Sequence, residues 1–153
     1  MLLEAKNLFK VYKLRKREIP VLRDVSLEIK KAEFVAIEGP SGAGKSTLLH
    51  ILGGLDTPTR GEVIFNGVDI YRVSEGERAV LRNRKVGFVF QFYHLLPELD
   101  VLENVTLPNF LKSWWGRKKG VADARELLER VGLSARLNHR PNELSGGQQQ
   151  RVA

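Results

Sequence analysis

A glycine-rich segment near residue 40 has the residue types and spacing of a phosphate-binding loop. Gly39 is followed by four residues and then by Gly44, Lys45 and the hydroxyl residue Ser46. Glycines let the backbone turn tightly with its amides pointing inward, and the N-terminus of a following helix also favours an anion. In this chemistry Lys45 contacts the β- and γ-phosphates of ATP, and Ser46 coordinates Mg²⁺. A glycine turn joining a strand to a helix is the alternative.

The loop predicts a set of nucleotide-binding residues. Thr47 either assists in binding or only continues the helix. The candidates are Gly39, Ser41, Gly42, Gly44, Lys45, Ser46 and Thr47.

A second glycine motif, Leu144-Ser145-Gly146-Gly147-Gln148, lies about a hundred residues later. Two glycines before a run of glutamines make a poor hairpin. A Ser-Gly-Gly start to a helix would instead create another terminus that faces an anion.

Composition sets the broad class. The chain has 153 residues, with 42% hydrophobic and 28% charged residues, as expected for one globular domain with room for a subdomain. No apolar run is long enough to span a bilayer and no signal-peptide core is present, so we expect a cytosolic protein. The absence of cysteine excludes disulfides and thiolate metal sites.

The net charge of +7 has three interpretations. It is typical of a solvated basic face, of attraction to an anionic membrane surface, or of nucleic-acid binding. The basic run at 13–17 lacks interleaved aromatic residues, so nucleic acid is not an expected partner.

Alternating and periodic patterns predict the elements that position the loop. Residues 2–12 and 19–30 read as strands of an antiparallel layer joined by a charged turn at 13–18. The continuous apolar run 34–37 predicts a buried parallel strand, and 45–52 predicts a helix.

Later segments are predicted in the same way. A strand at 61–66 ends in an Asn-Gly turn, a polar helix covers 75–84, and a buried strand covers 86–90. After Gln91 only helices are indicated, at 101–107 and 122–131.

Together the two motifs resemble the nucleotide-binding subunit of ABC transporters over essentially the whole chain. Four further stretches resemble the branch that serves lipoprotein release and macrolide export: 48–56, 58–63, 91–97 and 102–108. The resemblance implies an α/β fold: a P-loop ATPase core with an N-terminal antiparallel β layer, an inserted helical subdomain and an absent C-terminal part. It divides the chain into an ATP-binding core (1–91), a helical subdomain (92–143), and the second motif with the start of its helix (144–153).

The resemblance also implies a mechanism. Two subunits form a head-to-tail dimer, and each ATP lies between one phosphate-binding loop and the partner's second motif. The residues of that motif are Ser145, Gly146, Gly147 and Gln148. Closure and reopening of the dimer drive an integral-membrane permease subunit, which places the protein peripherally at the cytoplasmic face of the inner membrane.

Four residues receive specific roles from the loop motif and the resemblance together. Lys45 and Gln91 are the catalytic candidates, Ser46 and Gln91 are the Mg²⁺ candidates, and Tyr12 stacks on adenine. From sequence alone, Gln91 also reads as a polar residue that ends a strand, and Tyr12 as a half-buried strand aromatic.

The helical subdomain contains Trp114-Trp115 followed by basic residues. Two adjacent tryptophans cannot both face one side of a helix, so one of them is a candidate for contact with a partner or with lipid. Packing within the subdomain is the alternative. His50, His94 and His139 show no spacing typical of metal ligands.

The chain departs from the family pattern in two places. Ala32 stands where the family has a glycine before the loop strand. The chain also ends before the positions of the metal-binding Asp, the catalytic Glu and the switch His. We therefore expect the intact protein to be an ATPase, whereas hydrolysis by these 153 residues is in doubt. A non-hydrolysing regulatory remnant and a cell-division relative are the alternatives.

Overall fold

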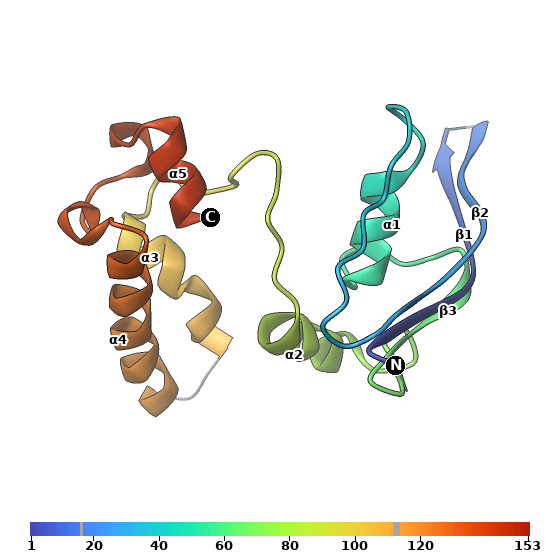
Figure 1. Cartoon of the computed structure of the whole chain (residues 1–153), viewed down its shortest axis with the longest axis horizontal. Helices are drawn as coiled ribbons and strands as arrows, with labels where there is room; N and C mark the ends of the chain where they lie inside the picture. The colour runs from blue at the N-terminus through green and yellow to red at the C-terminus, as the bar shows by residue number, and fades with distance from the viewer. Residues whose placement is uncertain (16, 112–113) are drawn as a thin grey trace. The chain divides into compact units, whose positions relative to one another are not determined.

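The computed structural model describes residues 1–15, 17–111 and 114–153, apart from the side chains of residues 110–118. The chain forms two compact units, Met1–Val86 and Gly87–Ala153, each with its own hydrophobic core (Figure 1). The predicted exposure of Trp114 or Trp115 falls on side chains outside this description.

The first unit is built on an antiparallel sheet. Strands β1 (Leu3–Leu14) and β2 (Arg17–Ile29) pair along their length, and β3 (Arg60–Phe65) pairs with the other edge of β1. The short strand β4 (Val68–Asp69) completes the order β2-β1-β3-β4. The predicted antiparallel layer is confirmed, and its first two strands extend further into the charged turn than the pattern indicated.

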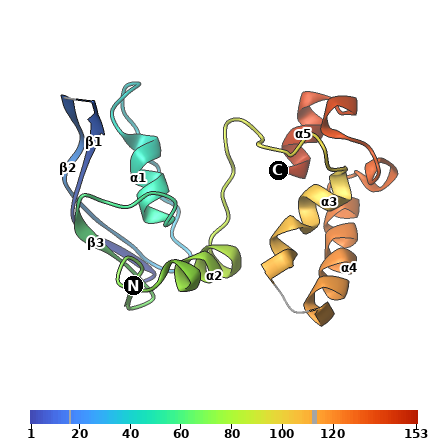
Figure 2. The same ribbon diagram turned by 180° about the vertical axis from the view of Figure 1, so that it is seen from behind.

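Helix α1 (Lys45–Leu52) follows the predicted phosphate-binding loop and begins and ends as predicted. It lies beside the β1–β2 ribbon in both views (Figures 1 and 2), and its apolar side packs on the sheet. Removal of these side chains from water is the main stabilising contribution to this unit. The buried core consists of Ala5, Leu8, Leu22, Leu48, Ile51, Leu52, Val63 and Ile70.

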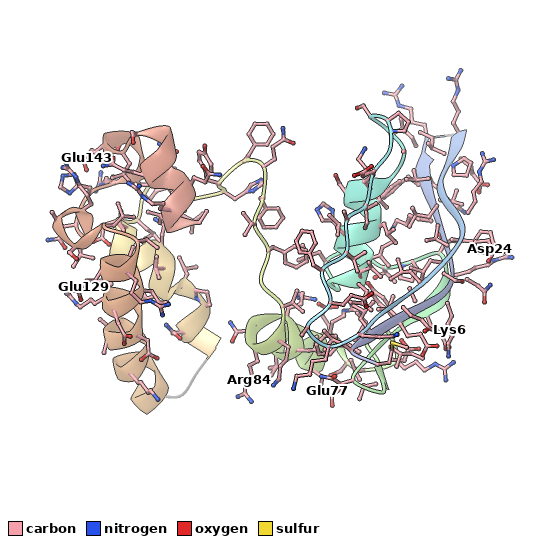
Figure 3. The ribbon with its side chains drawn as sticks, in the orientation of Figure 1. Lys6, Asp24, Glu77, Arg84, Glu129 and Glu143 are labelled. Atoms are coloured by element: carbon pink, nitrogen blue, oxygen red, sulfur yellow. The ribbon has the colours of Figure 1, made fainter. Side chains whose placement is uncertain are left out.

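Helix α2 (Glu75–Lys85) completes the first unit and matches the predicted polar helix. Ser74 caps its N-terminus by a reciprocal pair of hydrogen bonds with Glu77. Charged residues such as Glu77 and Arg84 are exposed on α2 (Figure 3). The helix therefore forms without burying any residue fully.

The second unit contains only helices and loops among its described residues. Its α-helices are α3 (Val101–Thr106), α4 (Trp114–Arg130) and α5 (Gly146–Val152). The 3₁₀ turns are η1 (Leu107–Leu111), η2 (Ser134–Arg136) and η3 (Pro141–Glu143). Helices α3 and α4 lie side by side in both views (Figures 1 and 2), and the core is formed by Val101, Leu128, Leu133 and Leu144.

Two predicted strands are wrong. Residues 34–37 and 86–90 have no strand structure, and Phe34 and Val89 are 96% and 84% exposed. A buried parallel strand needs backbone partners on both sides. Within the described residues, the one sheet is the antiparallel layer, and neither segment belongs to it. Apolar composition alone therefore did not produce a strand here.

Candidate functional site

The predicted phosphate-binding loop occupies residues 39–47 of the first unit and leads directly into α1. Gly44 is the N-cap residue of this helix, and no side chain caps the helix. The first turn of α1 also carries no acidic residue. Its N-terminal amides therefore have no side-chain acceptor of their own, and the positive end of the helix dipole is not neutralised.

The other capped helices differ from α1 in this respect. Helices α2, α3 and α5 each close their N-terminus with a reciprocal capping pair, Ser74 with Glu77, Asp100 with Glu103, and Ser145 with Gln148. Such pairs satisfy two backbone donors. Helix α1, which follows the glycine loop, thus lacks a side-chain cap. A bound anion would accept hydrogen bonds from its N-terminal amides in place of that cap.

Gly44 is also the residue through which the loop contacts the sheet. Its φ is +87°, and a β-carbon placed on it would lie 3.0 Å from both the Cγ1 atom and the carbonyl oxygen of Val21. Residues with a side chain rarely adopt this φ, and one of the two contacted atoms of Val21 belongs to the backbone. Only glycine therefore fits at position 44 without a displacement of the backbone. Strand β2 therefore sets the position at which α1 begins.

Lys45 reaches back into the loop. Its Nζ atom donates hydrogen bonds to the carbonyl oxygens of Gly39 and Pro40, at 2.8 Å and 2.7 Å. Ser46 is exposed and Thr47 is half-buried in the same first turn. The ammonium group, the helix terminus and the hydroxyls thus gather around one short segment, an arrangement suited to a polyanion.

Tyr12 lies on β1 and belongs to the same unit as the loop. Its side chain is held by the Asp56 carboxylate, because the Tyr12 hydroxyl donates to Asp56 Oδ2 at 2.6 Å. The Nζ atom of Lys10 lies 4.7 Å from the centroid of the Tyr12 ring. Partial burial and the bond to Asp56 raise the pKa of Tyr12, and the Thr47 hydroxyl acts in the opposite direction. The residue itself remains 40% exposed.

Asp56 contacts the candidate Tyr12 but was not itself predicted as a site residue. Burial opposes its ionisation, but hydrogen bonds from Lys10 and Tyr12 outweigh this effect and lower the pKa of the carboxyl group. The charged form of Asp56 is therefore the stable one in the folded protein. No spacing rule marks this residue, since its partners lie more than forty positions away in sequence.

Gln91 and the second glycine motif lie in the second unit. Gln91 is exposed in a loop. Leu144 is buried in the core of that unit, which anchors the start of α5. Ser145 and Gln148 form the capping pair of α5, with distances of 2.9 Å and 3.3 Å. The loop candidates and Tyr12 therefore belong to one unit, and Gln91 and the second motif to the other.

Two further features of the described residues bear on other functions. No group of three or more histidine, aspartate or glutamate side chains is arranged to hold a metal ion there. In those same residues no helix combines the length and the apolar character needed to cross a membrane. His139 contacts Arg136 at 2.8 Å.

Known proteins match this chain over its length. The ABC transporter family profile matches residues 22–153. An uncharacterised ABC transporter ATP-binding protein of Thermotoga maritima is 53% identical over 99% of the chain. The lipoprotein-releasing system ATP-binding protein LolD of Acinetobacter baylyi is 51% identical over the whole chain. The chain spans about two thirds of these relatives, 64% and 67% of their lengths.

Solved structures agree with the sequence matches. The dimeric ATP-binding cassette MJ0796, in a post-hydrolysis state bound to ADP and Pi, is 43% identical and superposes with a TM-score of 0.86. A second dimeric structure of the same cassette gives a TM-score of 0.87. Each match covers 99% of this chain and 66% of the solved chain. The predicted fold class, a cassette core with an antiparallel layer and helices, is confirmed.

Proposed function

The chain belongs to the ABC transporter family, and from that premise we propose that it binds ATP for a transport ATPase. The observation that carries the proposal is the uncapped N-terminus of α1 beside Lys45. Helix termini of this kind bind phosphate groups through backbone amides. Family membership supplies the coupling to transport, in which ATP binding and hydrolysis do work on a membrane subunit.

Each loop residue has a role in this proposal. Lys45 exchanges its two carbonyl contacts for the β- and γ-phosphates, which are stronger partners because both groups are charged. The amides of the loop and of the first turn of α1 bind the remaining phosphate oxygens. Gly39, Ser41, Gly42 and Gly44 provide the backbone for this, and Thr47 lines the same turn.

Ser46 fits a magnesium ion. Its exposed hydroxyl offers oxygen, the ligand type that Mg²⁺ takes, in the first turn after the loop. When bound, Mg²⁺ would neutralise charge on the phosphates. Gln91 is proposed as the second protein residue near the ion, and as the link between the γ-phosphate and the helical unit.

Tyr12 is proposed to stack on adenine. The ring is exposed enough to receive a base and lies on β1, in the same unit as the loop. Its hydroxyl contacts Asp56 and the Lys10 ammonium lies over the ring, and 40% of the residue remains exposed to receive a base. Base stacking of this kind is tolerant of sequence and needs only an aromatic face.

The second motif is proposed to act on ATP held by another subunit. Two copies would associate head to tail, so that Ser145, Gly146, Gly147 and Gln148 of one copy meet the nucleotide of the other. The dimeric state of the MJ0796 cassette supports this assembly. A membrane permease is the proposed further partner, and the protein would act peripherally at the cytoplasmic face of the membrane.

The coupled process is proposed to be lipoprotein release. The likeness to the Acinetobacter protein supports it, because that protein is named for a lipoprotein-releasing system. Export of macrolides or peptides would use the same nucleotide chemistry, so the cargo has to be identified with the permease.

Substitution of Lys45 tests the nucleotide site. Lys45→Ala should weaken ATP binding roughly ten- to a hundredfold, since hydrogen bonds to charged groups are worth about 1.5–3 kcal/mol. Titration calorimetry with ATP and Mg²⁺ measures the change. Lys13→Ala is the matched control, because Lys13 is 79% exposed and pairs only loosely with Glu18 at 3.6 Å. Equal affinity of Lys45→Ala and the unsubstituted chain would rule out the assigned site.

A further inference from the structure

A network of three side chains fixes Tyr12 relative to the loop helix. Lys10 is only 8% exposed, and its Nζ atom donates to Asp56 Oδ1 at 2.5 Å and to the carbonyl of Thr57 at 2.6 Å. The other carboxylate oxygen of Asp56 accepts the Tyr12 hydroxyl at 2.6 Å. Both oxygens of Asp56 are thus used, one for a buried cation and one for the phenol.

The loop that carries Asp56 is attached firmly to the C-terminal end of α1. The backbone amides of Leu55 and Asp56 donate to the carbonyl of His50. The hydroxyl of Tyr71 shares its one proton between the carbonyls of Ile51 and Asp56, at 2.6 Å and 2.5 Å. Asp56 is therefore held by the same helix whose N-terminus forms the phosphate-binding site.

This arrangement defines the orientation of the Tyr12 ring. A tyrosine on a strand surface ordinarily has several staggered rotamers. The hydroxyl bond to Asp56 and the cation of Lys10 beside the ring favour one of them. Thr47, in the first turn of α1, is close enough to the Tyr12 hydroxyl to influence its pKa. The ring thus lies near the first turn of α1, with its hydroxyl bonded to Asp56.

We propose that Asp56 is a positioning residue for the nucleotide base, holding the Tyr12 ring in the orientation on which the base stacks. The inference rests on the proposed function, since it requires ATP at the loop. Asp56 does not contact the nucleotide. It contributes by preorganisation, because a ring already held in place loses less freedom on binding.

The experiment separates the base from the phosphates. The affinity of the chain for ATP and for inorganic tripolyphosphate, each with Mg²⁺, is measured by calorimetry. Tripolyphosphate has no base, so the ratio of the two affinities reports base binding alone. Three variants are compared with the unsubstituted chain: Asp56→Ala, Tyr12→Phe, which removes only the hydroxyl, and the double variant.

We expect the ratio of ATP affinity to tripolyphosphate affinity to fall about three- to tenfold in each single variant. Stacking on an aromatic ring contributes roughly fivefold to hundredfold to affinity. Loss of the ring's fixed orientation should remove only part of that contribution. Tripolyphosphate affinity should not change. The double variant should lose no more than the larger single loss, because both substitutions break one contact. Glu62→Ala is the control, since Glu62 pairs with Lys6 and Arg72 on the same sheet without touching Tyr12.

The outcomes distinguish the inference from the function. An unchanged ratio in folded Tyr12→Phe overturns the positioning role, and this variant decides the matter if Asp56→Ala does not fold. Additive losses in the double variant also overturn it, because Asp56 would then act by another route. If the unsubstituted chain binds neither ligand, the proposed function itself fails.

Discussion

At the scale of the residue, Gly44 has two roles: it is the N-cap residue of α1 at the end of the loop, and it packs against Val21 of the sheet. Its positive φ and its contact with Val21 both exclude a side chain. Gly42 has a similar φ of +81°, but a β-carbon there would meet nothing within 4 Å. The two glycines therefore separate the cost of backbone conformation from the cost of crowding.

We predict that Gly44→Ala lowers the free energy of unfolding by about 2–4 kcal/mol, the sum of a left-handed backbone and an overpacked contact. Gly42→Ala should cost only the backbone part, about 1–2 kcal/mol. Urea unfolding followed by circular dichroism measures both. Equal losses in the two variants would contradict the assigned contact with Val21.

Polar contacts at the same scale explain why Lys10 tolerates burial. A buried ammonium group is unfavourable unless a charged or polar partner is present. Asp56 and the carbonyl of Thr57 supply such partners. The Lys10–Asp56 ion pair thus stabilises the fold as well as the proposed orientation of Tyr12. A substitution of Asp56 can therefore affect the folded unit as a whole. Comparing the affinity for ATP with the affinity for tripolyphosphate separates that effect from base binding.

At the scale of the element, the α-helices whose N-caps the structure describes are of two kinds. Those with a side-chain cap, such as α2 and α5, begin independently of any ligand. Helix α1 begins at Gly44 without one. Of the two helices that the structure describes in the first unit, α1 is therefore the one whose N-terminus is open to the proposed anion.

We predict that Ser74→Ala lowers the free energy of unfolding of the first unit by about 1 kcal/mol, because the amide of Glu77 loses its acceptor. Ser74→Asp retains an acceptor oxygen and adds a charge favoured at this end of a helix, so it should restore most of the loss. Urea unfolding again provides the measurement. A Ser74→Ala variant as stable as the original would show that the cap contributes nothing to α2.

At the scale of the whole molecule, the proposed dimer separates the two glycine motifs between subunits. Each composite site then needs Lys45 from one copy and the second motif from the other. A β-carbon on Gly147 would meet nothing within 4 Å, so a substitution there should leave the second unit folded. Gly147→Asp places a negative charge where the proposal puts the partner's phosphates.

We predict that neither Lys45→Ala nor Gly147→Asp alone forms dimers with ATP, whereas an equal mixture of the two does. In the mixed dimer one site combines both defects, and the other site has an intact loop and an intact second motif. Analytical ultracentrifugation with and without ATP measures this. Absence of ATP-dependent dimers in the mixture, when the unsubstituted chain forms them, would place both motifs at one subunit's own nucleotide.

The sequence by itself determined the elements that depend on neighbouring residues. Period-two patterns predicted β1 and β2, and the loop spacing with the apolar residues after it predicted α1. These predictions hold because backbone turns and one-sided burial are set by residues a few positions apart. The family resemblance also rested on short contiguous motifs, and the comparisons with known proteins confirmed it.

Only the tertiary structure decided the features that depend on distant partners. The apolar runs at 34–37 and 86–90 have the composition of buried strands, yet strand structure requires hydrogen bonds from another segment. The Asp56 network joins positions on β1 to a loop beyond α1, and no local pattern records that they meet. The composition of a segment shows how many apolar side chains it could bury. Which other segments pack or pair with it is determined by the rest of the fold.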